Sequence, residues 1–294
     1  MRFGAGLEAG VEPFPGYHLR RRLGAGSFGE VWEAVGSHGE QLALKFLPCD
    51  GKNTVAREIR SVQAIGQLRH PHLIRIERIW CFQRYLVIAM ELADGTLADL
   101  FQTYIAEGNK AILPEHLCLL LTEAAEALDF LNARRHQVEG RMVAIQHCDV
   151  KPSNLLLVED TLKVADFSLS SSMSAHVETR CRSGTLDYCA PEVFQGRLSS
   201  QTDQYALAVT YCLLRGGRLP FSDTPPTFQA NYTRPVPDLT MLSAAERPLI
   251  AQALNPVPQN RWPSCGELMA RLTRIICGVA STKPGQRSGL RQRI

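Results

Sequence analysis

Residues 147–154 read His-Cys-Asp-Val-Lys-Pro-Ser-Asn, and an apolar run typical of a strand follows directly at 155–158. This short loop carries a carboxylate, an ammonium group and an amide at fixed offsets, from Asp149, Lys151 and Asn154. Twelve residues beyond Asn154, Asp166 ends a second apolar run. An amide and a carboxylate at neighbouring strand ends suit Mg²⁺, which takes few protein ligands besides phosphate oxygens. Each piece is common alone, but chance explains this order along the chain poorly.

A glycine-rich segment precedes this loop at residues 23–31 and reads Leu-Gly-Ala-Gly-Ser-Phe-Gly-Glu-Val. Gly24, Gly26 and Gly29 match the spacing G-x-G-x-x-G, which Rossmann-type nucleotide-binding folds also use. In a Rossmann fold the turn leads into a helix, whereas residues 31–35 here have the pattern of a second strand. We therefore expect a hairpin whose backbone N–H groups lie over phosphates. A plain glycine-rich hairpin is the alternative.

Lys45 lies within an apolar strand predicted over 41–48. A single lysine in a strand usually faces solvent, but the helix predicted next, over 53–65, offers a partner. Its Glu58 lies on or beside the face that the apolar residues of this helix would bury. A carboxylate there needs a cation to offset its lost hydration, so we expect a Lys45–Glu58 ion pair. The alternative is a Glu58 side chain that reaches solvent.

The hydrophobic pattern divides the chain into two parts. Up to residue 92 it predicts one helix among short strands, at 17–23, 30–35, 41–48, 73–79 and 84–91. Beyond residue 92 it predicts helices at 115–133, 201–214, 243–254 and 265–277. The helix predicted at 201–214 is apolar on nearly every face, which suits the centre of a lobe. We predict an α+β fold with a small β-rich N-lobe and a larger, mainly α-helical C-lobe.

The predicted boundaries are a flexible leader at 1–16, the N-lobe at 17–92, the C-lobe at 93–280 and a basic flexible tail at 281–294. The net charge of +3 arises in this tail, because without its four bases 28 basic residues face 29 acidic ones. A nucleic-acid-binding domain would show a basic face on its folded part instead. We expect the tail to be solvated, and an anion-binding arm is the alternative.

Composition excludes further classes. With 294 residues, of which 45% are hydrophobic, the chain is too apolar for wholesale disorder. No apolar run approaches the ~18 residues that cross a bilayer, and the N-terminus lacks the apolar core of a secretory signal, so we expect a soluble protein. The nine cysteines are scattered and form no C-x-x-C pair. This argues against structural zinc and favours free thiols in a reducing compartment, which indicates the cytoplasm.

Together and in this order, the motifs resemble those of eukaryotic-like serine/threonine protein kinases, a family also common in bacteria, over about 17–280. The resemblance implies a bilobal fold that binds ATP and Mg²⁺ or Mn²⁺ between its lobes and phosphorylates protein substrates. It implies that the three glycines cover the phosphates. It also implies that Lys45, paired with Glu58, holds the α- and β-phosphates.

The resemblance assigns roles to the first-quoted residues as well. Asp149 would accept the proton of the substrate hydroxyl, and Lys151 would stabilise the transferring phosphoryl group, in a position similar to Ser/Thr rather than Tyr kinases. Asn154 and Asp166 would bind the metal ions. The resemblance also implies an adenine pocket. The ring would lie between the side chains of Leu23, Val31, Ala43 and Leu156, with Met90 as the gatekeeper. The hinge, whose backbone would pair with adenine, would be Glu91, Leu92 and Ala93.

Later markers follow the family order too. Ala190-Pro191-Glu192 is similar to the family's A-P-E, and Arg261 resembles the buried partner of Glu192. Asp203 opens the long apolar helix, and Gly184-Thr185 resembles the segment that docks the substrate. The order of these markers supports the resemblance more than any one of them.

The sequence departs from the family at three places. Cys148 replaces the arginine of H-R-D that meets a phosphorylated activation loop, and a thiol cannot bind phosphate in that way, so we expect activity without loop phosphorylation. Ser168 replaces a glycine, which would restrict flipping of that segment without implying inactivity. The segment 132–146 is longer than usual and predicts a solvated hairpin or loop, or else a docking site for a partner.

Two other functions stay open. One is a pseudokinase that binds nucleotide or partners without transferring phosphate. Against it, Lys45, Glu58, Asp149, Lys151, Asn154 and Asp166 are all present. The other is a small-molecule phosphotransferase of related fold, which the peptide-docking character of 184–192 disfavours. The sequence leaves the physiological substrate, the activating signal and the oligomeric state open.

Overall fold

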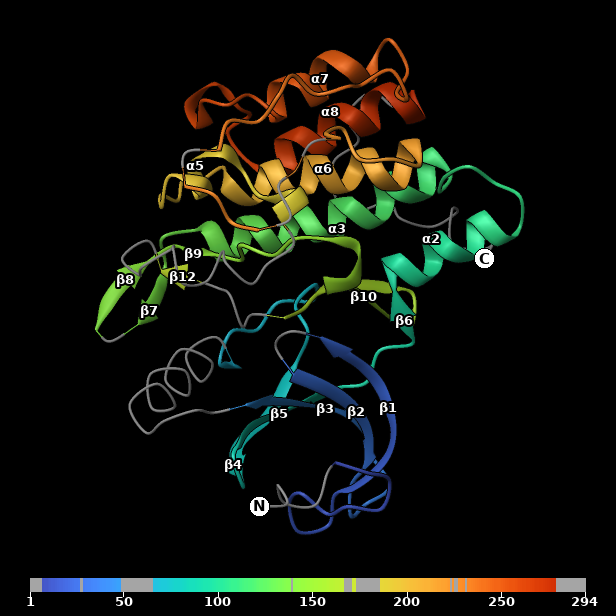
Figure 1. The fold of residues 1–294 in the computed structure, drawn as a ribbon, viewed down its shortest axis with the longest axis vertical. Coiled ribbons are helices and arrows are strands. Elements are labelled where there is room, and N and C mark those ends of the chain that lie inside the picture. The colour runs from blue at the N-terminus through green and yellow to red at the C-terminus, as the bar shows by residue number, and fades with distance from the viewer. Residues whose placement is uncertain are drawn as a thin grey trace.

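The computed structural model describes residues 7–26, 29–48, 66–138, 140–166, 171–172, 186–222, 224, 227–230 and 232–278. It has a β-rich N-terminal lobe and a mainly helical C-terminal lobe (Figure 1). This is the α+β fold that the sequence predicts. Within the described part of the chain, no helix has the length and apolar character needed to cross a bilayer.

The N-lobe is a five-stranded antiparallel sheet in the order β1-β2-β3-β5-β4. Its strands are β1 (His18–Gly26), β2 (Gly29–Val35), β3 (Gln41–Pro48), β4 (Ile76–Phe82) and β5 (Tyr85–Glu91). β1 and β2 form the predicted glycine-rich hairpin, in which Gly26 pairs with Gly29. The backbone requires glycine at position 29, where φ is +133° and a Cβ would lie 1.9 Å from the Phe46 carbonyl oxygen.

β4 begins three residues later than the sequence predicts, because the preceding segment contacts the C-lobe. Leu73 forms a parallel bridge with Val164, and the Ile74 N–H donates to the Val164 carbonyl at 3.0 Å. The Val164 N–H donates to His72 O at 2.9 Å. The backbone of 72–74 therefore pairs across the two lobes rather than with β5. The helix predicted over 53–65 lies outside the described residues.

Residues 7–16 contact the sheet, although the sequence analysis assigned them to a flexible leader. Leu7 and Val11 pack against a cluster of buried N-lobe side chains. The Leu19 N–H donates to the Val11 carbonyl at 3.0 Å, and Trp80 Nε1 donates to the Pro13 carbonyl at 3.0 Å. The pattern of 7–16 shows no periodicity, so the sequence alone does not reveal this packing.

The C-lobe consists of stacked helices joined by short strands. Its helices are α2 (Leu97–Ala106), α3 (Pro114–Asn132), α5 (Pro191–Phe194), α6 (Thr202–Gly216), α7 (Glu246–Ala253) and α8 (Cys265–Cys277). Helix α3 contacts α8 directly, since the Asp129 carboxylate accepts from the N–H groups of Cys265 and Gly266. Helix α6 packs against α3, α7 and α8 (Figure 1). Its side chains from Thr202 to Cys212 are buried, as expected for a helix that is apolar on most faces. Gly217, at φ +76°, ends this helix.

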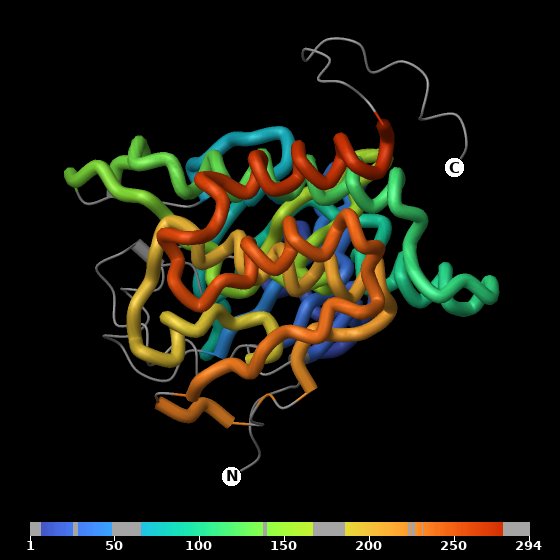
Figure 2. Tube along the Cα trace, turned by 90° about the horizontal axis from the view of Figure 1, so that it is seen from above, coloured from blue at the N-terminus to red at the C-terminus, as the bar shows by residue number. Residues whose placement is uncertain are grey.

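The short strands of the C-lobe form small sheets of their own. β10 (Leu155–Val158) pairs with β11 (Thr161–Val164) and with β6 (Gly95–Thr96). β9 (Ile145–Gln146) pairs with β12 (Ser171–Ser172). The segment 132–146 contains an antiparallel hairpin of β7 (His136–Val138) and β8 (Arg141–Val143), which projects from one side of the molecule in Figures 1 and 2.

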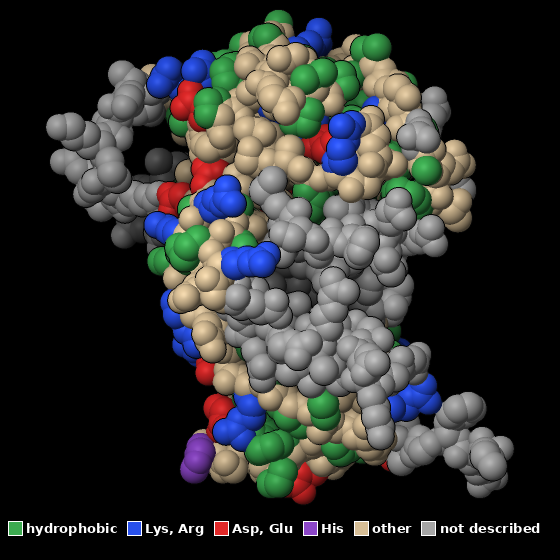
Figure 3. Space-filling model, turned by 90° about the vertical axis from the view of Figure 1, so that its left-hand side faces the viewer, with side chains coloured by type: hydrophobic (Ala, Val, Ile, Leu, Met, Phe, Trp, Pro, Cys, Tyr) green, Lys and Arg blue, Asp and Glu red, His purple; other side chains and the backbone are tan. Residues whose placement is uncertain are grey.

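Charged side chains are mixed over the surface that Figure 3 shows. On its described part, Lys and Arg side chains are spread over both lobes, and several lie next to acidic ones. This view fits the near-neutral balance of charge outside the tail.

Candidate active site

The loop 147–154 is held at its start by Asp203, the second residue of α6. The backbone N–H groups of His147 and Cys148 donate to the two carboxylate oxygens of Asp203 at 2.8 and 2.9 Å. Burial raises the pKa of Asp203, while His147 and these two N–H groups act in the opposite direction. Cys148 has a φ of +66°, a conformation that is unusual outside glycine. The central helix thus fixes a strained turn directly before Asp149.

His147 joins this loop to the segment that ends at Asp166. Its Nε2 lies 2.8 Å from the Ala165 carbonyl oxygen, so Nε2 carries the proton and donates it. The Asp149 N–H lies 3.3 Å from Nδ1 of the same ring, which accepts. The imidazole is fully buried between the two segments. It therefore fixes the spacing between the loop and Asp166.

Asp149 lies at the centre of a polar triad. Lys151 Nζ lies 2.9 Å from Asp149 Oδ2, and Asn154 Nδ2 donates to the same oxygen at 2.8 Å. Asn154 Nδ2 also donates to the Asp149 carbonyl at 2.8 Å. The Asp149 side chain is only 5% exposed, so this carboxylate is oriented by protein donors rather than by water. Of the three residues that the sequence placed at fixed offsets, two thus converge on the carboxylate of the third.

A second ion pair crosses between the lobes. Lys45 Nζ, on β3, lies 2.5 Å from Oδ1 of Asp166, which follows β11. The Lys45 side chain is 9% exposed and that of Asp166 is 24% exposed. The sequence analysis did not predict this pair. Glu58, the partner it predicted for Lys45, lies outside the described residues.

Asn154 and Asp166 form a donor set that fits Mg²⁺. The Ala165 N–H donates to the Asn154 carbonyl at 2.9 Å, which places the two segments side by side. One offers an amide oxygen and the other a carboxylate, both hard ligands that Mg²⁺ prefers. Within the described residues no three His, Cys, Asp or Glu side chains gather as a metal site. The set therefore suits an ion that phosphate oxygens also hold.

The residues expected around adenine lie on adjoining strands of the sheet, except Leu156. In the register, Gly24 lies opposite Val31, Val31 opposite Lys45, and Ala43 opposite Met90. Leu156 is on β10, where it pairs with Thr96 and Lys163. Met90 and Leu156 both pack against the large hydrophobic core. Leu23, on β1, is 40% exposed.

The expected hinge, 91–93, connects β5 to β6. Glu91 lies opposite Leu42 on β3, and its carboxylate accepts from Lys163 Nζ at 2.7 and 2.8 Å. The same carboxylate accepts from the Arg75 N–H at 2.7 Å. These contacts bring the hinge together with β11, three residues before Asp166. The sequence analysis did not find the Glu91–Lys163 pair.

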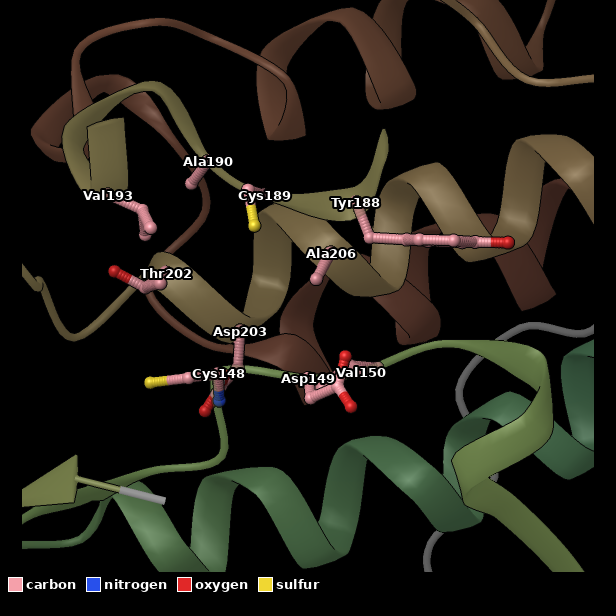
Figure 4. A pocket seen from close by; sticks show the side chains of 10 residues that line it. All are labelled: Cys148, Asp149, Val150, Tyr188, Cys189, Ala190, Val193, Thr202, Asp203 and Ala206. Atoms are coloured by element: carbon pink, nitrogen blue, oxygen red, sulfur yellow. The ribbon is translucent and has the colours of Figure 1, made fainter. Parts of the chain in front are cut away.

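A cavity adjoins Asp149 on the side of the C-lobe. It is partly open to solvent, and its walls come from the loop 147–154, α6 and residues 188–193. Figure 4 shows Asp149 and Cys148 on one side and Tyr188, Cys189 and Ala190 on the other. Burial, with the charges of Asp187 and Asp149, raises the pKa of Tyr188 to about 12, so its hydroxyl stays protonated at neutral pH.

Glu192 and Arg261 form the predicted buried pair. Arg261 Nη1 and Nη2 donate to the two carboxylate oxygens of Glu192 at 2.8 and 2.7 Å, a bidentate geometry. The Arg261 side chain is fully buried and that of Glu192 is 6% exposed. This pair fixes the start of α5, directly after the wall of the cavity.

A family model described as the protein kinase domain matches residues 17–292 of the chain. The chain belongs to the protein kinase family. It is 32% identical over 314 residues to the serine/threonine-protein kinase PknF of Mycobacterium tuberculosis, a match that covers 95% of this chain and 62% of the relative. It is 33% identical over 263 residues to CBL-interacting serine/threonine-protein kinase 7 of Arabidopsis thaliana, covering 83% of this chain and 57% of the relative. The chain thus spans less than two thirds of the length of these relatives.

Within this kinase domain, the structure brings together five of the six predicted catalytic and metal-binding residues. Asp149, Lys151 and Asn154 form one group, and Lys45 and Asp166 adjoin it through the contacts of Ala165. Of the remaining candidates, Glu58 lies outside the described residues, as do Ser168, Gly184 and Thr185. Their predicted roles stay predictions.

Proposed function

We propose that the chain is an active protein serine/threonine kinase that transfers the γ-phosphoryl group of Mg-ATP to hydroxyl groups of protein Ser or Thr residues. The observation that carries this proposal is the convergence of Lys151 and Asn154 on a single oxygen of Asp149. This arrangement orients the carboxylate that would accept the hydroxyl proton. The family supports ATP and a divalent metal as its cofactors.

The proposed reaction forms a bond between the substrate oxygen and the γ-phosphorus and breaks the bond from that phosphorus to the β–γ bridging oxygen. The hydroxyl proton passes to Asp149. Lys151 lies 2.9 Å from this carboxylate, so its ammonium stabilises negative charge that spreads over the phosphoryl oxygens of a loose transition state. Lys45 would hold the α- and β-phosphates. Asn154 and Asp166 would hold Mg²⁺, which neutralises phosphate charge when bound.

Transfer of labelled phosphate tests the proposal. Purified protein is incubated with γ-labelled ATP, Mg²⁺ and a generic basic acceptor protein, in parallel with Lys45→Met and with Lys110→Met as a control at an exposed lysine. We expect label on Ser or Thr of the acceptor with wild type and with Lys110→Met, and almost none with Lys45→Met. A wild-type protein whose melting temperature rises with ATP but which transfers no label would be a pseudokinase and would contradict the proposal.

We also propose that activity does not depend on phosphorylation of the activation segment. The side chain at position 148 is a thiol, whose Sγ donates to the Gln146 carbonyl at 3.6 Å. It has no guanidinium with which to bind a phosphoserine or phosphothreonine.

Phosphatase treatment therefore has a defined expected result. Protein stripped of phosphate, as mass spectrometry verifies, should keep most of its initial rate on an acceptor peptide. The initial rate is measured before autophosphorylation can restore phosphate. Near-total loss of that rate would show that another group takes the role of the missing arginine.

A cytoplasmic location remains part of the proposal. The described cysteines, which include Cys118, Cys148, Cys189 and Cys265, are all free thiols. Burial raises the pKa of Cys118 to about 12, so this thiol stays protonated and unreactive. Free thiols support a reducing compartment.

A further inference from the structure

Arg234 is a buried cation that the proposed reaction does not use. It lies in the irregular segment between α6 and α7 and is 9% exposed. Its Nη2 donates to the carbonyl oxygens of Leu186, Asp187 and Cys189, the last two at 2.8 and 2.9 Å. Its Nε lies 3.3 Å from the Cys189 carbonyl as well. One guanidinium thus binds three carbonyl groups of the segment 186–189.

The guanidinium is itself held in place. Its Nη1 donates to Thr224 Oγ1 at 2.7 Å, and its central carbon, Cζ, lies 4.8 Å from the centre of the Phe221 ring. The rings of Phe194 and Tyr232 lie at 5.6 and 5.8 Å. Aromatic faces attract a guanidinium and limit its movement. Arg234 is therefore a fixed donor array rather than a mobile surface arginine.

Burial removes the hydration of the Arg234 guanidinium, and this cost in free energy must be offset by other contacts. Its partners in the described part of the chain are carbonyl oxygens, one hydroxyl and aromatic rings. An apolar side chain would fill the same space without the cost of dehydrating a cation. What arginine adds is a planar array of donors that matches several carbonyl groups at once, which lysine cannot reproduce.

The segment that Arg234 binds forms a wall of the cavity beside Asp149. Residues 186–188 form a 3₁₀ turn, and Tyr188, Cys189 and Ala190 line the cavity opposite Asp149 (Figure 4). Directly beyond it, the Glu192–Arg261 pair fixes the chain. Arg234 is not among the residues that line the cavity, but it binds the backbone of this wall. We expect the position of the wall next to Asp149 to depend on this contact.

We propose that Arg234 is a positioning residue for the protein substrate: it fixes the backbone of 186–189 so that the acceptor hydroxyl reaches Asp149. This inference rests on the proposed kinase function. It goes beyond that function because it separates binding of the protein acceptor from binding of ATP. Among the contacts of Arg234 with the described residues, none is to a residue assigned to ATP or the metal ion. We therefore expect its loss to affect the protein acceptor and to leave nucleotide binding unchanged.

Steady-state kinetics of the full chain test this inference. The variants are Arg234→Met and Arg234→Lys, with Arg218→Met as control. Arg218 lies in the same connecting segment, but its partners are the side chains of Asp238 and Thr240, and its own side chain is 47% exposed. We expect Arg234→Met to raise KM for an acceptor protein by about tenfold or more, with Kd for ATP within about twofold of wild type. The acceptor KM of Arg234→Lys should lie between those of wild type and Arg234→Met, and that of Arg218→Met should match wild type.

The split between KM and kcat separates positioning from a merely structural role. A variant that only lowers the folded fraction loses kcat per mole of protein and keeps its KM for the acceptor. An unchanged acceptor KM in both Arg234 variants would overturn the inference, as would an equal loss of ATP affinity. If Arg234→Met does not fold, Arg234→Lys and Thr224→Val are measured in the same way. Absence of transfer by wild type would overturn the proposed function and this inference together, whereas normal transfer with unaltered KM in the variants overturns this inference alone.

Discussion

Replacing Asp149 by asparagine is expected to lower turnover by roughly 10²–10⁴-fold while leaving the affinity for ATP within about twofold of wild type. Two donors, Lys151 Nζ and Asn154 Nδ2, contact the same oxygen of Asp149. An asparagine in that place would turn its carbonyl oxygen toward these donors. Its NH₂ group, which cannot accept a proton, would then take the place of the second carboxylate oxygen.

The measurement is the rate of phosphate transfer at saturating ATP, together with ATP affinity by calorimetry. Asp160→Asn is the matched control, because it makes the same chemical change at an exposed turn between β10 and β11. Its rate should equal that of wild type. An Asp149→Asn variant that keeps more than about a tenth of the wild-type rate would remove Asp149 from the proposed chemistry.

Replacing Arg261 by methionine is expected to lower the free energy of unfolding by about 3–5 kcal/mol, because it leaves the carboxylate of Glu192 buried without its cation. Arg261 donates twice to Glu192, and also to the carbonyl groups of Gln201 and Asn255 at 3.0 and 2.8 Å. Among the described residues, Glu192 would keep only two hydroxyl donors, Thr202 Oγ1 at 3.0 Å and Ser199 Oγ at 3.1 Å. Two hydroxyl-type contacts do not offset the lost ion pair and the buried charge.

Urea denaturation measures this free energy. Arg21→Met is the control, since Arg21 also pairs with a glutamate, Glu33, at 2.6 Å, but its side chain is 73% exposed. That exposed pair should contribute no more than about 1 kcal/mol. The double variant Arg261→Met with Glu192→Leu should be more stable than Arg261→Met alone, because it no longer buries an unpaired charge. A cost below about 1 kcal/mol for Arg261→Met would contradict this assignment.

Local patterns in the sequence predicted local structure well. The strand at 41–48 and the helix at 265–277 have the bounds that the sequence predicts, because an apolar strand and a helix capped by Ser264 are specified by neighbouring residues. Helix α2 was not predicted as a separate element. Its capping box, in which Thr96 Oγ1 accepts from the Asp99 N–H and the Asp99 carboxylate accepts from the Thr96 N–H, was the available signal.

Few contacts between distant residues were predicted. The Glu192–Arg261 pair was predicted because the family resemblance supplied it, and the approach of Asn154 to Asp166 because both lie at the ends of predicted strands. The Lys45–Asp166 and Glu91–Lys163 pairs join residues 121 and 72 positions apart, and no periodicity marks such partners. Arg234 binds backbone carbonyl groups, which every residue carries, so its partners leave no trace in the sequence.

A crystal structure with a non-hydrolysable ATP analogue and Mg²⁺ tests the central claim most directly. We expect the triphosphate between the lobes, with Lys45 on its phosphates, Asn154 and Asp166 on the metal ion, and the γ-phosphate facing Asp149. A nucleotide bound elsewhere, or a metal ion bound by other side chains, would contradict it.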